Sequence, residues 1–462
     1  MNWYPSSRGL MMSRETEHLD VAAIGAGPFN LGFASLAEPI PELSLAVLEA
    51  TEQITWHPGM MLDGTHLQVP FLADLVTMAD PTSPYSFLNY LKDRGRIYPF
   101  YIRENFYALR DEFSNYLAWA AEQLSSVRLG HRVVDVRYRD GAYRVSAVTA
   151  QGMSTISADR LVLGTGSQPY QPDALTDDAR RSNRIVHSSR YLFAREPMLR
   201  PGVSDARPKV VTVLGSGQSA AEVILDLLRS LPDEDHLVWL TRAERFFPLE
   251  YTKLSLEMTS PEYIDFFHAL PIEARDNIAA GQNGLYKGIN ADLINEIHDE
   301  LYRRSVHGEP RVHIRTGCTA TAISAPGDTI DITLRHAQEA RQLRLATDYL
   351  IMATGYRPHI PDFLEGIASR IRWLPDGRPD VDREYGVGLH EDVFVQNAEL
   401  HTHGYSAPDL GMGAYRNSVL LNRISGRKVY PVEQHISFQE FGAVEFDGLP
   451  TMRRPANAST RT

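Results

Sequence analysis

The sequence predicts an α/β protein with two Rossmann-like dinucleotide-binding domains and a small, mainly helical substrate region. Two short apolar runs, residues 21–24 and 210–214, each lead into a Gly-x-Gly turn. A helical pattern follows each turn, and the order strand, glycine turn, helix is typical of the phosphate-binding unit of a Rossmann fold. Two such units in one chain indicate two bound dinucleotides and electron transfer between them.

The first turn contains Gly25 and Gly27, which let the backbone approach a pyrophosphate at the N-terminus of the following helix. Asn30 replaces the third glycine of the usual pattern. The next strand ends in Glu49, where a carboxylate can bond a ribose hydroxyl. This favours an unphosphorylated ribose, as in FAD or NAD, although Glu49 can also be a solvated strand end.

The second turn contains Gly215 and Gly217, and the strand after it ends in Arg242 with Arg245 close behind. No acidic residue stands at this strand end. A cationic side chain there suits a 2′-phosphate, so we expect NADPH rather than NADH at this turn. The alternative is that Arg242 is a solvated strand end.

The composition sets limits on the class of protein. The 462 residues allow two or three domains, and 43% hydrophobic with 23% charged residues is ordinary for a globular protein. A net charge of −12 argues against nucleic acid or an anionic membrane as a partner. We find neither the apolar core of a signal peptide nor a membrane-spanning stretch, and therefore expect a cytoplasmic protein.

Cys318 is the only cysteine. It excludes an internal disulfide and a Cys-x-x-Cys pair, and therefore the dithiol–disulfide reductases that also bind two dinucleotides. We expect Cys318 to be a packed strand or loop residue.

The expected domain organisation follows the two turns. We assign residues 1–17 to a flexible tail, 18–195 and 346–450 to a discontinuous FAD-binding domain, 205–345 to an NADPH-binding domain, about 250–305 to a helical substrate segment within it, and 451–462 to a second flexible tail. A long loop rich in Pro, Trp and His is expected over residues 54–84.

Several segments are more specific than either glycine turn alone. They are residues 25–31, 56–60, 67–76, 80–91, 215–220, 353–356 and 401–404. Together they resemble the flavin-dependent N-hydroxylating monooxygenases of siderophore biosynthesis, which hydroxylate lysine, ornithine or diamines. The resemblance runs from about residue 18 to residue 422, and Asn30 then becomes this family's own form of the FAD turn.

The resemblance implies a reaction cycle and a set of site residues. NADPH reduces FAD, the reduced flavin captures O₂ as a C4a-hydroperoxide, a neutral primary amine attacks the distal oxygen, and NADP⁺ stays bound. The cofactors supply the chemistry, and the protein orients them and excludes water. The implied cofactor-binding residues are Gly25, Gly27, Pro28, Asn30, Glu49, Trp56, His57 and Gln68 for FAD, Gly215, Gly217, Gln218, Ser219 and Arg242 for NADPH, and Thr354, Gly355 and Tyr356.

Gln68 and His403 are the candidate catalytic residues, Gln68 beside the flavin and residues 401–404 closing on the isoalloxazine. Neither need be an acid–base catalyst, and both Gln68 and Trp56 can instead be packing residues. The His401-x-His403 pair, if it lies on a strand, points to one face. A transition-metal site needs a third ligand, which we do not find, so no metal is expected.

One departure from the family pattern concerns the substrate. Ala73 stands where the members acting on amino acids carry a lysine for the α-carboxylate, and Leu285 aligns with an asparagine of the ornithine enzymes. A buried carboxylate without a partner costs several kcal/mol. We therefore expect a diamine such as putrescine, cadaverine or diaminopropane, with Asp409 as a candidate for its distal ammonium. If Lys253 or Lys287 replaces the missing lysine, the enzyme is instead an L-lysine N6- or L-ornithine N5-monooxygenase.

Two further functions stay open: a generic pyridine-nucleotide:flavin oxidoreductase that makes peroxide or reduces a partner, and a nucleotide-sensing protein that has lost catalysis. The expected partners are the diamine and O₂, without nucleic acid or membrane, and the resemblance favours a homotetramer or homodimer.

Overall fold

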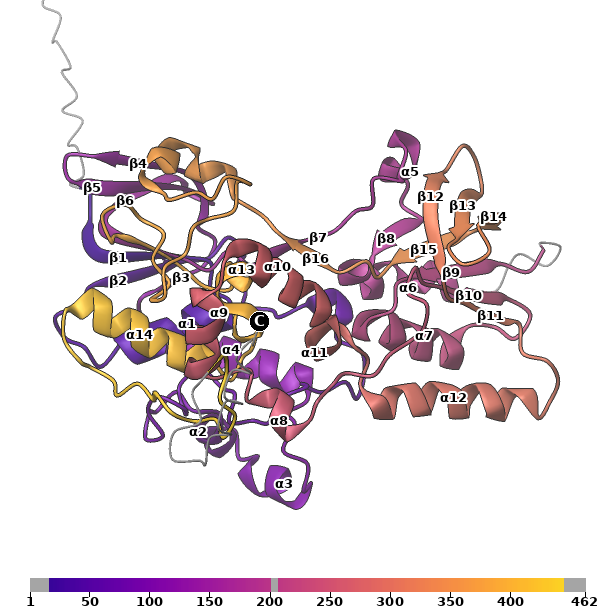
Figure 1. The fold of residues 1–462 in the computed structure, drawn as a ribbon, viewed down its shortest axis with the longest axis horizontal. Coiled ribbons are helices and arrows are strands. Elements are labelled where there is room, and N and C mark those ends of the chain that lie inside the picture. The colour runs from indigo at the N-terminus through magenta and orange to yellow at the C-terminus, as the bar shows by residue number, and fades with distance from the viewer. Residues whose placement is uncertain (1–15, 201–206, 444–462) are drawn as a thin grey trace, which may run out of the picture.

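The computed structural model describes residues 16–200 and 207–443. Two α/β units lie side by side, a ribbon of two short strands crosses between them, and a group of short helices lies at the junction (Figure 1). The predicted tails fall mostly outside the described residues. Glu17, which we had placed in the first tail, forms an ion pair with Arg128 at 2.6 Å and therefore belongs to the fold.

The first unit is built on a seven-stranded sheet. Its order is β3-β2-β1-β6-β5-β4, and β17 also pairs with β6. The bounds are β1 (His18–Ile24), β2 (Leu45–Leu48), β3 (Val127–Arg128), β4 (Arg132–Arg139), β5 (Ala142–Thr149), β6 (Gly152–Leu163) and β17 (Val393–Val395). The strands around β1 are parallel, and β4, β5 and β6 form an antiparallel edge.

Helix α1 (Pro28–Ala37) lies between this sheet and α14 (Gly413–Ser425), and it is buried from Asn30 to its end. This helix is covered on both sides, and apolar residues occupy most of its positions. The other elements are η1 (Pro58–Met60), α2 (Phe87–Asp93), α3 (Ile97–Ile102), α4 (Arg110–Gln123) and η3 (Asp362–Arg370). The predicted long loop separates β2 from α2 and contains only η1.

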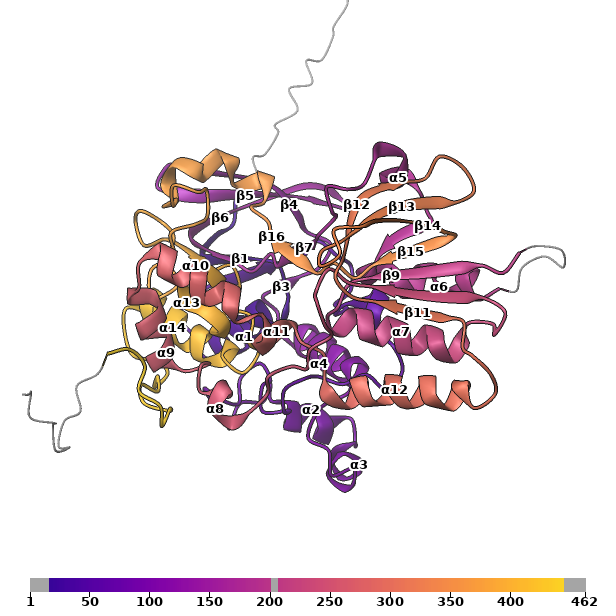
Figure 2. The same cartoon turned by 45° about the vertical axis from the view of Figure 1, so that its right-hand side comes forward.

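The second unit is built on a five-stranded parallel sheet of order β11-β10-β9-β15-β8, and α7 and α12 pack together along one side of it (Figure 2). A three-stranded antiparallel sheet, β12-β13-β14, completes the unit. The strands are β8 (Ile185–His187), β9 (Val210–Leu214), β10 (His236–Leu240), β11 (Val312–Arg315), β12 (Cys318–Ser324), β13 (Ile330–His336), β14 (Gln342–Thr347) and β15 (Tyr349–Met352). The helices are α5 (Asp177–Arg181), η2 (Ser188–Arg190), α6 (Tyr191–Leu199), α7 (Gln218–Ser230) and α12 (Ala291–Ser305).

The expected domain boundaries need a correction. We had assigned residues 18–195 and 346–450 to the first domain, but β8 and β15 are parallel neighbours in the second sheet, where β15 lies beside β9. A short apolar strand does not reveal which of two sheets it joins. The chain crosses between the units through β7 (Ser167–Pro169) and β16 (Tyr356–Pro358), which pair antiparallel.

The predicted helical segment at 250–305 divides into two parts. Its short helices α8 (Lys253–Leu256), α9 (Pro261–Ala269), α10 (Ile272–Gly281) and α11 (Asn283–Lys287) include two, α9 and α10, that contact α13 (Leu400–His403) and η4 (Gly404–Ser406) of the first unit. Its last helix, α12, packs on α7 and belongs to the second unit.

Cys318 is fully buried at the start of β12, which confirms that it is a packed strand residue. Among the described residues, we find no helix with the length and apolar character needed to cross a membrane. The cytoplasmic location remains a prediction.

Candidate active site

The first turn is shaped for close approach by a ligand. Gly25 has φ +91°, and a Cβ added there would lie 2.5 Å from the carbonyl oxygen of Gly164. A Cβ on Gly27 would meet no atom within 4 Å, so open space lies before the N-terminus of α1. Pro28 is the first helical residue, where its missing N–H costs nothing. The turn therefore fits a pyrophosphate.

Asn30 supports this turn from behind. It is fully buried, and its Nδ2 donates to the carbonyl oxygens of Gly25 at 2.7 Å and Ile24 at 3.2 Å. Its Oδ1 accepts from Gln396, which precedes α13 and which sequence analysis missed. With both amide hydrogens used inside the protein, Asn30 shapes the turn and does not face a ligand.

Glu49 lies against the same turn. Its Oε2 accepts from the backbone N–H of Ala26 at 2.8 Å, and its Oε1 accepts from the backbone and hydroxyl of Thr51, both at 2.9 Å. The carboxylate is thus fixed at the carboxyl edge of the sheet. Its contact with a ribose remains a prediction.

The long loop brings Trp56, His57 and Gln68 toward the junction of the units. Trp56 is half-buried, with its ring 5.3 Å edge-on from Phe113, so part of it is core. His57 is exposed with φ +50°, and its ring lies 6.1 Å from that of Tyr356. Gln68 is half-buried and accepts a hydrogen bond from a residue of the second unit.

The second turn repeats the geometry of the first. Gly215 has φ +148°, and an added Cβ would lie 2.1 Å from the carbonyl oxygen of Ala353. Gly217 is the N-cap of α7, so the backbone N–H groups of Gln218 and Ser219 have no acceptor within the helix. The Gln218 side chain bonds other protein groups, which leaves the backbone to hold phosphate.

Arg242 is exposed two residues after the end of β10. It has no ion-pair partner within residues 16–200 and 207–443, whereas Arg245 lies 3.7 Å from Glu244. Arg242 is therefore the freer cation at this strand end.

Thr354, Gly355 and Tyr356 lie where the chain crosses between the units. The Thr354 hydroxyl donates to the carbonyl oxygen of Tyr170, and the carbonyl oxygen of Gly355 accepts from the Tyr170 N–H at 2.9 Å. His187 Nε2 also contacts Gly355 O at 3.0 Å, and its ring lies 5.3 Å from that of Tyr356. These three residues therefore build the crossing itself, whatever they contribute to cofactor binding.

The expected strand at His401-x-His403 is wrong, because these residues form the short helix α13. The two imidazoles bond different carbonyl oxygens, His401 that of Pro379 at 2.7 Å and His403 that of Arg383 at 3.2 Å. His403 Nδ1 also lies 2.9 Å from the Thr402 hydroxyl. Burial lowers the pKa of His403 well below its usual range, so the ring is neutral and both its nitrogens are engaged.

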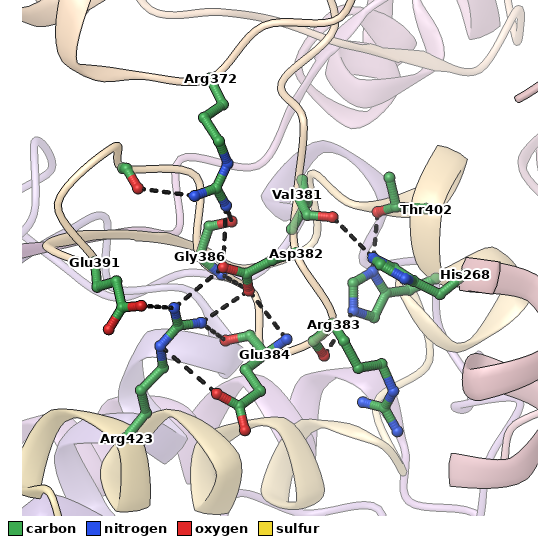
Figure 3. A network of polar contacts seen from close by, with 12 residues as sticks. His268, Arg372, Val381, Asp382, Arg383, Glu384, Gly386, Glu391, Thr402 and Arg423 are labelled. Carbon is green, nitrogen blue, oxygen red and sulfur yellow. Dashed lines mark hydrogen bonds and ion pairs between the residues drawn. The ribbon is translucent and has the colours of Figure 1, made fainter.

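A network of polar contacts holds the loop of residues 381–386 (Figure 3), and His403 joins it through the carbonyl oxygen of Arg383. His268 contacts the carbonyl oxygen of Val381 at 3.1 Å. Asp382 accepts from Arg423 at 2.8 Å and Arg372 at 3.0 Å. Burial acts to raise the pKa of Asp382, but the bonds from Arg423 and its other partners outweigh burial and lower it. In this arrangement His403 positions a loop.

The substrate candidates Ala73 and Asp409 lie together. A small cavity of about 10 Å³ has Pro28, Phe29 and Ala73 in its lining, which places Ala73 beside the first turn. A Cβ added to Gly411 would lie 3.9 Å from Ala73 Cβ and 2.9 Å from Asp409 Oδ1. The two candidate positions are therefore neighbours, and their contact with a substrate remains a prediction.

Asp409 is partly buried among tyrosines. Burial raises its pKa against the opposing hydrogen bonds from the backbone of Met412 and Gly411. Burial, the neighbouring Tyr107 and the charge of Asp409 raise the pKa of Tyr251 to about 12. Burial and Asp409 likewise raise the pKa of Tyr405. An acidic group in a poorly solvated pocket is suited to a cation.

Leu285 is buried in α11, and the ring of the next residue, Tyr286, lies 6.1 Å from that of Tyr405. Lys253 and Lys287 are both exposed, and Lys287 Nζ lies 5.1 Å from the Tyr286 ring. Neither lysine occupies the buried position that a replacement for the missing lysine would need.

Sequence analysis missed a buried pair behind this site. Arg416 Nε lies 3.1 Å from Glu399 Oε1, and the guanidinium carbon lies 4.5 Å from the centre of the Phe29 ring. The only signal in the sequence was the charge of Arg416 among apolar helix residues. A charged helix residue is more often exposed, so this signal did not indicate a buried pair.

Two glycine turns of matching geometry, one beside a carboxylate and one beside a free arginine, define an oxidoreductase that holds two dinucleotides. The family described as L-lysine 6-monooxygenase/L-ornithine 5-monooxygenase matches residues 17–358. The chain belongs to this family of flavin-dependent N-monooxygenases.

Individual relatives match over nearly the whole chain. The putrescine N-hydroxylase of Shewanella oneidensis is 42% identical over 448 residues, 96% of this chain and 88% of that protein. The FAD-bound cadaverine monooxygenase of desferrioxamine biosynthesis from Erwinia amylovora is 48% identical, with a TM-score of 0.88 over 92% of this chain and 99% of its own. An ornithine N-hydroxylase from Kutzneria sp. 744, solved with reduced FAD, NADP⁺ and L-ornithine, is 27% identical, with a TM-score of 0.81 over 89% of this chain and 100% of its own.

Proposed function

We propose that this enzyme uses FAD, NADPH and O₂ to hydroxylate one primary amine of an aliphatic diamine, such as putrescine or cadaverine, early in hydroxamate siderophore biosynthesis. The observation that carries the proposal is the closeness of Ala73 to the half-buried carboxylate of Asp409, beside the first glycine turn. L-lysine and L-ornithine are the alternative substrates.

Charge complementarity favours the diamine. An amino acid brings a carboxylate, which needs a cation when it is desolvated, and Asp409 would instead repel it. The two lysines considered as replacements are exposed. A diamine brings a second ammonium, which Asp409 can pair with, and leaves no carboxylate without a partner. The similarity to a putrescine N-hydroxylase and a cadaverine monooxygenase supports the same substrate class.

The residues present fit both cofactors. Gly25, Gly27 and the N-terminus of α1 would hold the FAD pyrophosphate, with Glu49 at its ribose. The backbone of Gln218 and Ser219 would hold the NADPH pyrophosphate, with Arg242 at the 2′-phosphate. When bound, NADPH supplies the hydride and the flavin supplies the activated oxygen.

The chain's own residues then bind and orient. Asp409 would anchor the distal ammonium and leave the other amine free to react, and Ala73 lies close to this carboxylate. The tyrosines around Asp409 exclude water, which strengthens that ion pair. The loop carrying Trp56 and Gln68 would cover the flavin side of the junction. A homo-oligomeric assembly remains a prediction.

A turnover panel tests the proposal. NADPH oxidation under O₂ is measured with putrescine, cadaverine, diaminopropane, L-lysine and L-ornithine, together with hydroxylamine formation. Coupled hydroxylamine with a diamine is expected. Uncoupled peroxide with every amine would indicate a generic flavin oxidoreductase, and a protein that retains no flavin would indicate a nucleotide sensor. Preference for an amino acid over every diamine would contradict the substrate assignment.

A further inference from the structure

A buried ion pair joins the two units. Arg110 is the first residue of α4 in the first unit, and Glu222 lies on α7 in the second; these helices meet where the units face each other (Figure 2). Arg110 Nη1 donates to Glu222 Oε2 at 2.8 Å and Nη2 to Oε1 at 2.6 Å. Their side chains are 16% and 4% exposed, so solvent screens the pair little.

A second polar link crosses the same boundary. Gln218, one turn before Glu222, donates to Glu222 Oε1 at 2.8 Å and accepts from the backbone N–H of Asn290 at 2.8 Å. Asn290 Nδ2 donates to Gln68 Oε1 at 3.1 Å, which returns the chain of hydrogen bonds to the first unit. Asn290 Oδ1 also caps α12 by accepting from the N–H groups of Asp292 and Leu293.

The first unit closes the circuit. The Leu67 N–H donates to the carbonyl oxygen of Ala108 at 2.9 Å, and the Arg110 N–H donates to that of Thr65 at 3.0 Å. The segment carrying Gln68 is thereby tied to the start of α4. The polar ring therefore consists of Arg110, Glu222, Gln218, Asn290 and Gln68, is closed by these backbone bonds of the first unit, and crosses between the units twice.

Such a ring fixes orientation more than it adds stability. A buried ion pair costs much of its attraction in desolvation, and well-packed apolar residues often stabilise a boundary as well or better. The planar fork of an arginine on a carboxylate instead restricts distance and angle together. The ring contains Gln218, the first residue of α7, which follows the second glycine turn. It also contains Gln68, which lies on the flavin side.

We propose that Arg110, Glu222 and Asn290 are positioning residues that hold the nucleotide turn of α7 at the correct distance and angle from the flavin face of the first unit. They act through Gln218 and Gln68 and set the geometry of hydride transfer. This inference rests on the two cofactors of the proposed function, but it does not depend on which amine is the substrate.

Two variants break the ring at different points. Glu222→Gln removes the charge that Arg110 faces and keeps the side-chain shape. Asn290→Ser keeps a good N-cap for α12 but is too short to reach Gln68. Glu296→Gln is the matched control, because Glu296 pairs with Arg229 between α12 and α7, inside the second unit and half exposed.

The first measurement is anaerobic flavin reduction by NADPH in the holoenzyme, without amine. We expect the limiting rate to fall on the order of tenfold in Glu222→Gln and at least threefold in Asn290→Ser, since small misplacements of reacting groups are costly. FAD content and reduction by dithionite should match the wild type, and Glu296→Gln should stay within twofold. A wild type that NADPH does not reduce would instead refute the proposed cofactor use.

The second measurement is hydrogen exchange in the FAD-loaded enzyme without NADPH. We expect faster exchange in the first turns of α4 and α12 in both ring variants and not in the control. Unchanged reduction rates would overturn the proposal. Slower reduction with unchanged exchange would also overturn it, because Glu222 would then act on the nucleotide itself. If Glu222→Gln does not fold, Asn290→Ser decides by the same criteria.

Discussion

The guanidinium of Arg416 lies 3.1 Å from the carboxylate of Glu399, and their side chains are only 1% and 0% exposed. Burial raises the pKa of Glu399, and the charge of Arg416 opposes that shift. Arg416 Nη2 also donates to the carbonyl oxygen of Ala407, two residues before Asp409, at 2.6 Å. The guanidinium lies over the ring of Phe29, at the start of α1 and directly after the first glycine turn. One buried pair therefore supports both the first turn and the candidate substrate carboxylate.

Arg416→Met should destabilise the protein strongly. It leaves the Glu399 carboxylate buried without its cation, and breaking such a pair costs about 3–5 kcal/mol. Urea unfolding followed by far-UV circular dichroism measures the change in unfolding free energy. Arg427→Gln, which removes an exposed ion pair with Glu42, is the control and should change it by less than about 1 kcal/mol. An equal effect of the two substitutions would contradict the structural role of the buried pair.

Ala73→Lys should lower diamine turnover. The new ammonium would lie near Asp409, compete for it and repel a dicationic substrate, so we expect kcat/KM for the diamine to fall at least about tenfold. Steady-state hydroxylamine formation checks this. Ala337→Lys, at an exposed position in the second unit, is the control for the added charge and should leave kcat/KM unchanged. An unaffected Ala73→Lys enzyme would mean that the diamine binds elsewhere.

Asp409→Asn should raise KM for the diamine while flavin reduction by NADPH stays near the wild-type rate. A charge-assisted hydrogen bond contributes about 1.5–3 kcal/mol, which corresponds to a loss of roughly tenfold or more. Stopped-flow reduction and steady-state kinetics separate the two effects. Equal losses in reduction and in diamine KM would point to a folding defect and not to a lost ammonium contact.

The same carboxylate gives a pH dependence with a definite sign. Burial raises the pKa of Asp409, so the ionised form that binds ammonium is lost as pH falls through this raised value. Diamine affinity in the wild type should therefore weaken as pH falls, and the loss should begin at a higher pH than the pKa of an ordinary aspartate would give. The Asp409→Asn enzyme should lack this limb and keep only the dependence that comes from the amine nucleophile. A limb that survives in Asp409→Asn would assign it to another group.

Arg242→Ala should raise KM for NADPH by about tenfold or more and change that for NADH little. Only NADPH carries the 2′-phosphate that a free arginine at the end of β10 can bond. Initial rates with both nucleotides check the prediction, and Arg341→Ala is the control because Arg341 is an exposed arginine of the second unit that pairs with Glu339 away from this strand end. Equal effects of Arg242→Ala on both nucleotides would mean that the phosphate is bound elsewhere, with Arg245 the next candidate.

Features that depend on consecutive residues could be predicted before any contact was known. Each glycine turn requires a particular backbone in a few adjacent positions, and both turns have the expected strand before them and helix after them. Glu49 follows its strand by the expected spacing and lies at the first turn. The absence of a second cysteine and the alanine at position 73 are read directly from the chain. The conformation of a short turn and the chemistry of a single side chain depend on adjacent residues, so these predictions did not require knowledge of tertiary contacts.

The way in which distant segments combine could not be predicted, because it depends on contacts that form when the chain folds. Which sheet β8 and β15 join, and that His403 lies on a helix and holds a loop, depended on packing that a short apolar or alternating pattern does not specify. Asn30 is hydrogen-bonded to Gln396, which is 366 residues away in the sequence, and Arg110 to Glu222, which is 112 residues away. Pairs so far apart in the sequence leave no periodic signal, because each residue by itself looks like an ordinary surface polar residue. Its structural role comes only from burial against its partner.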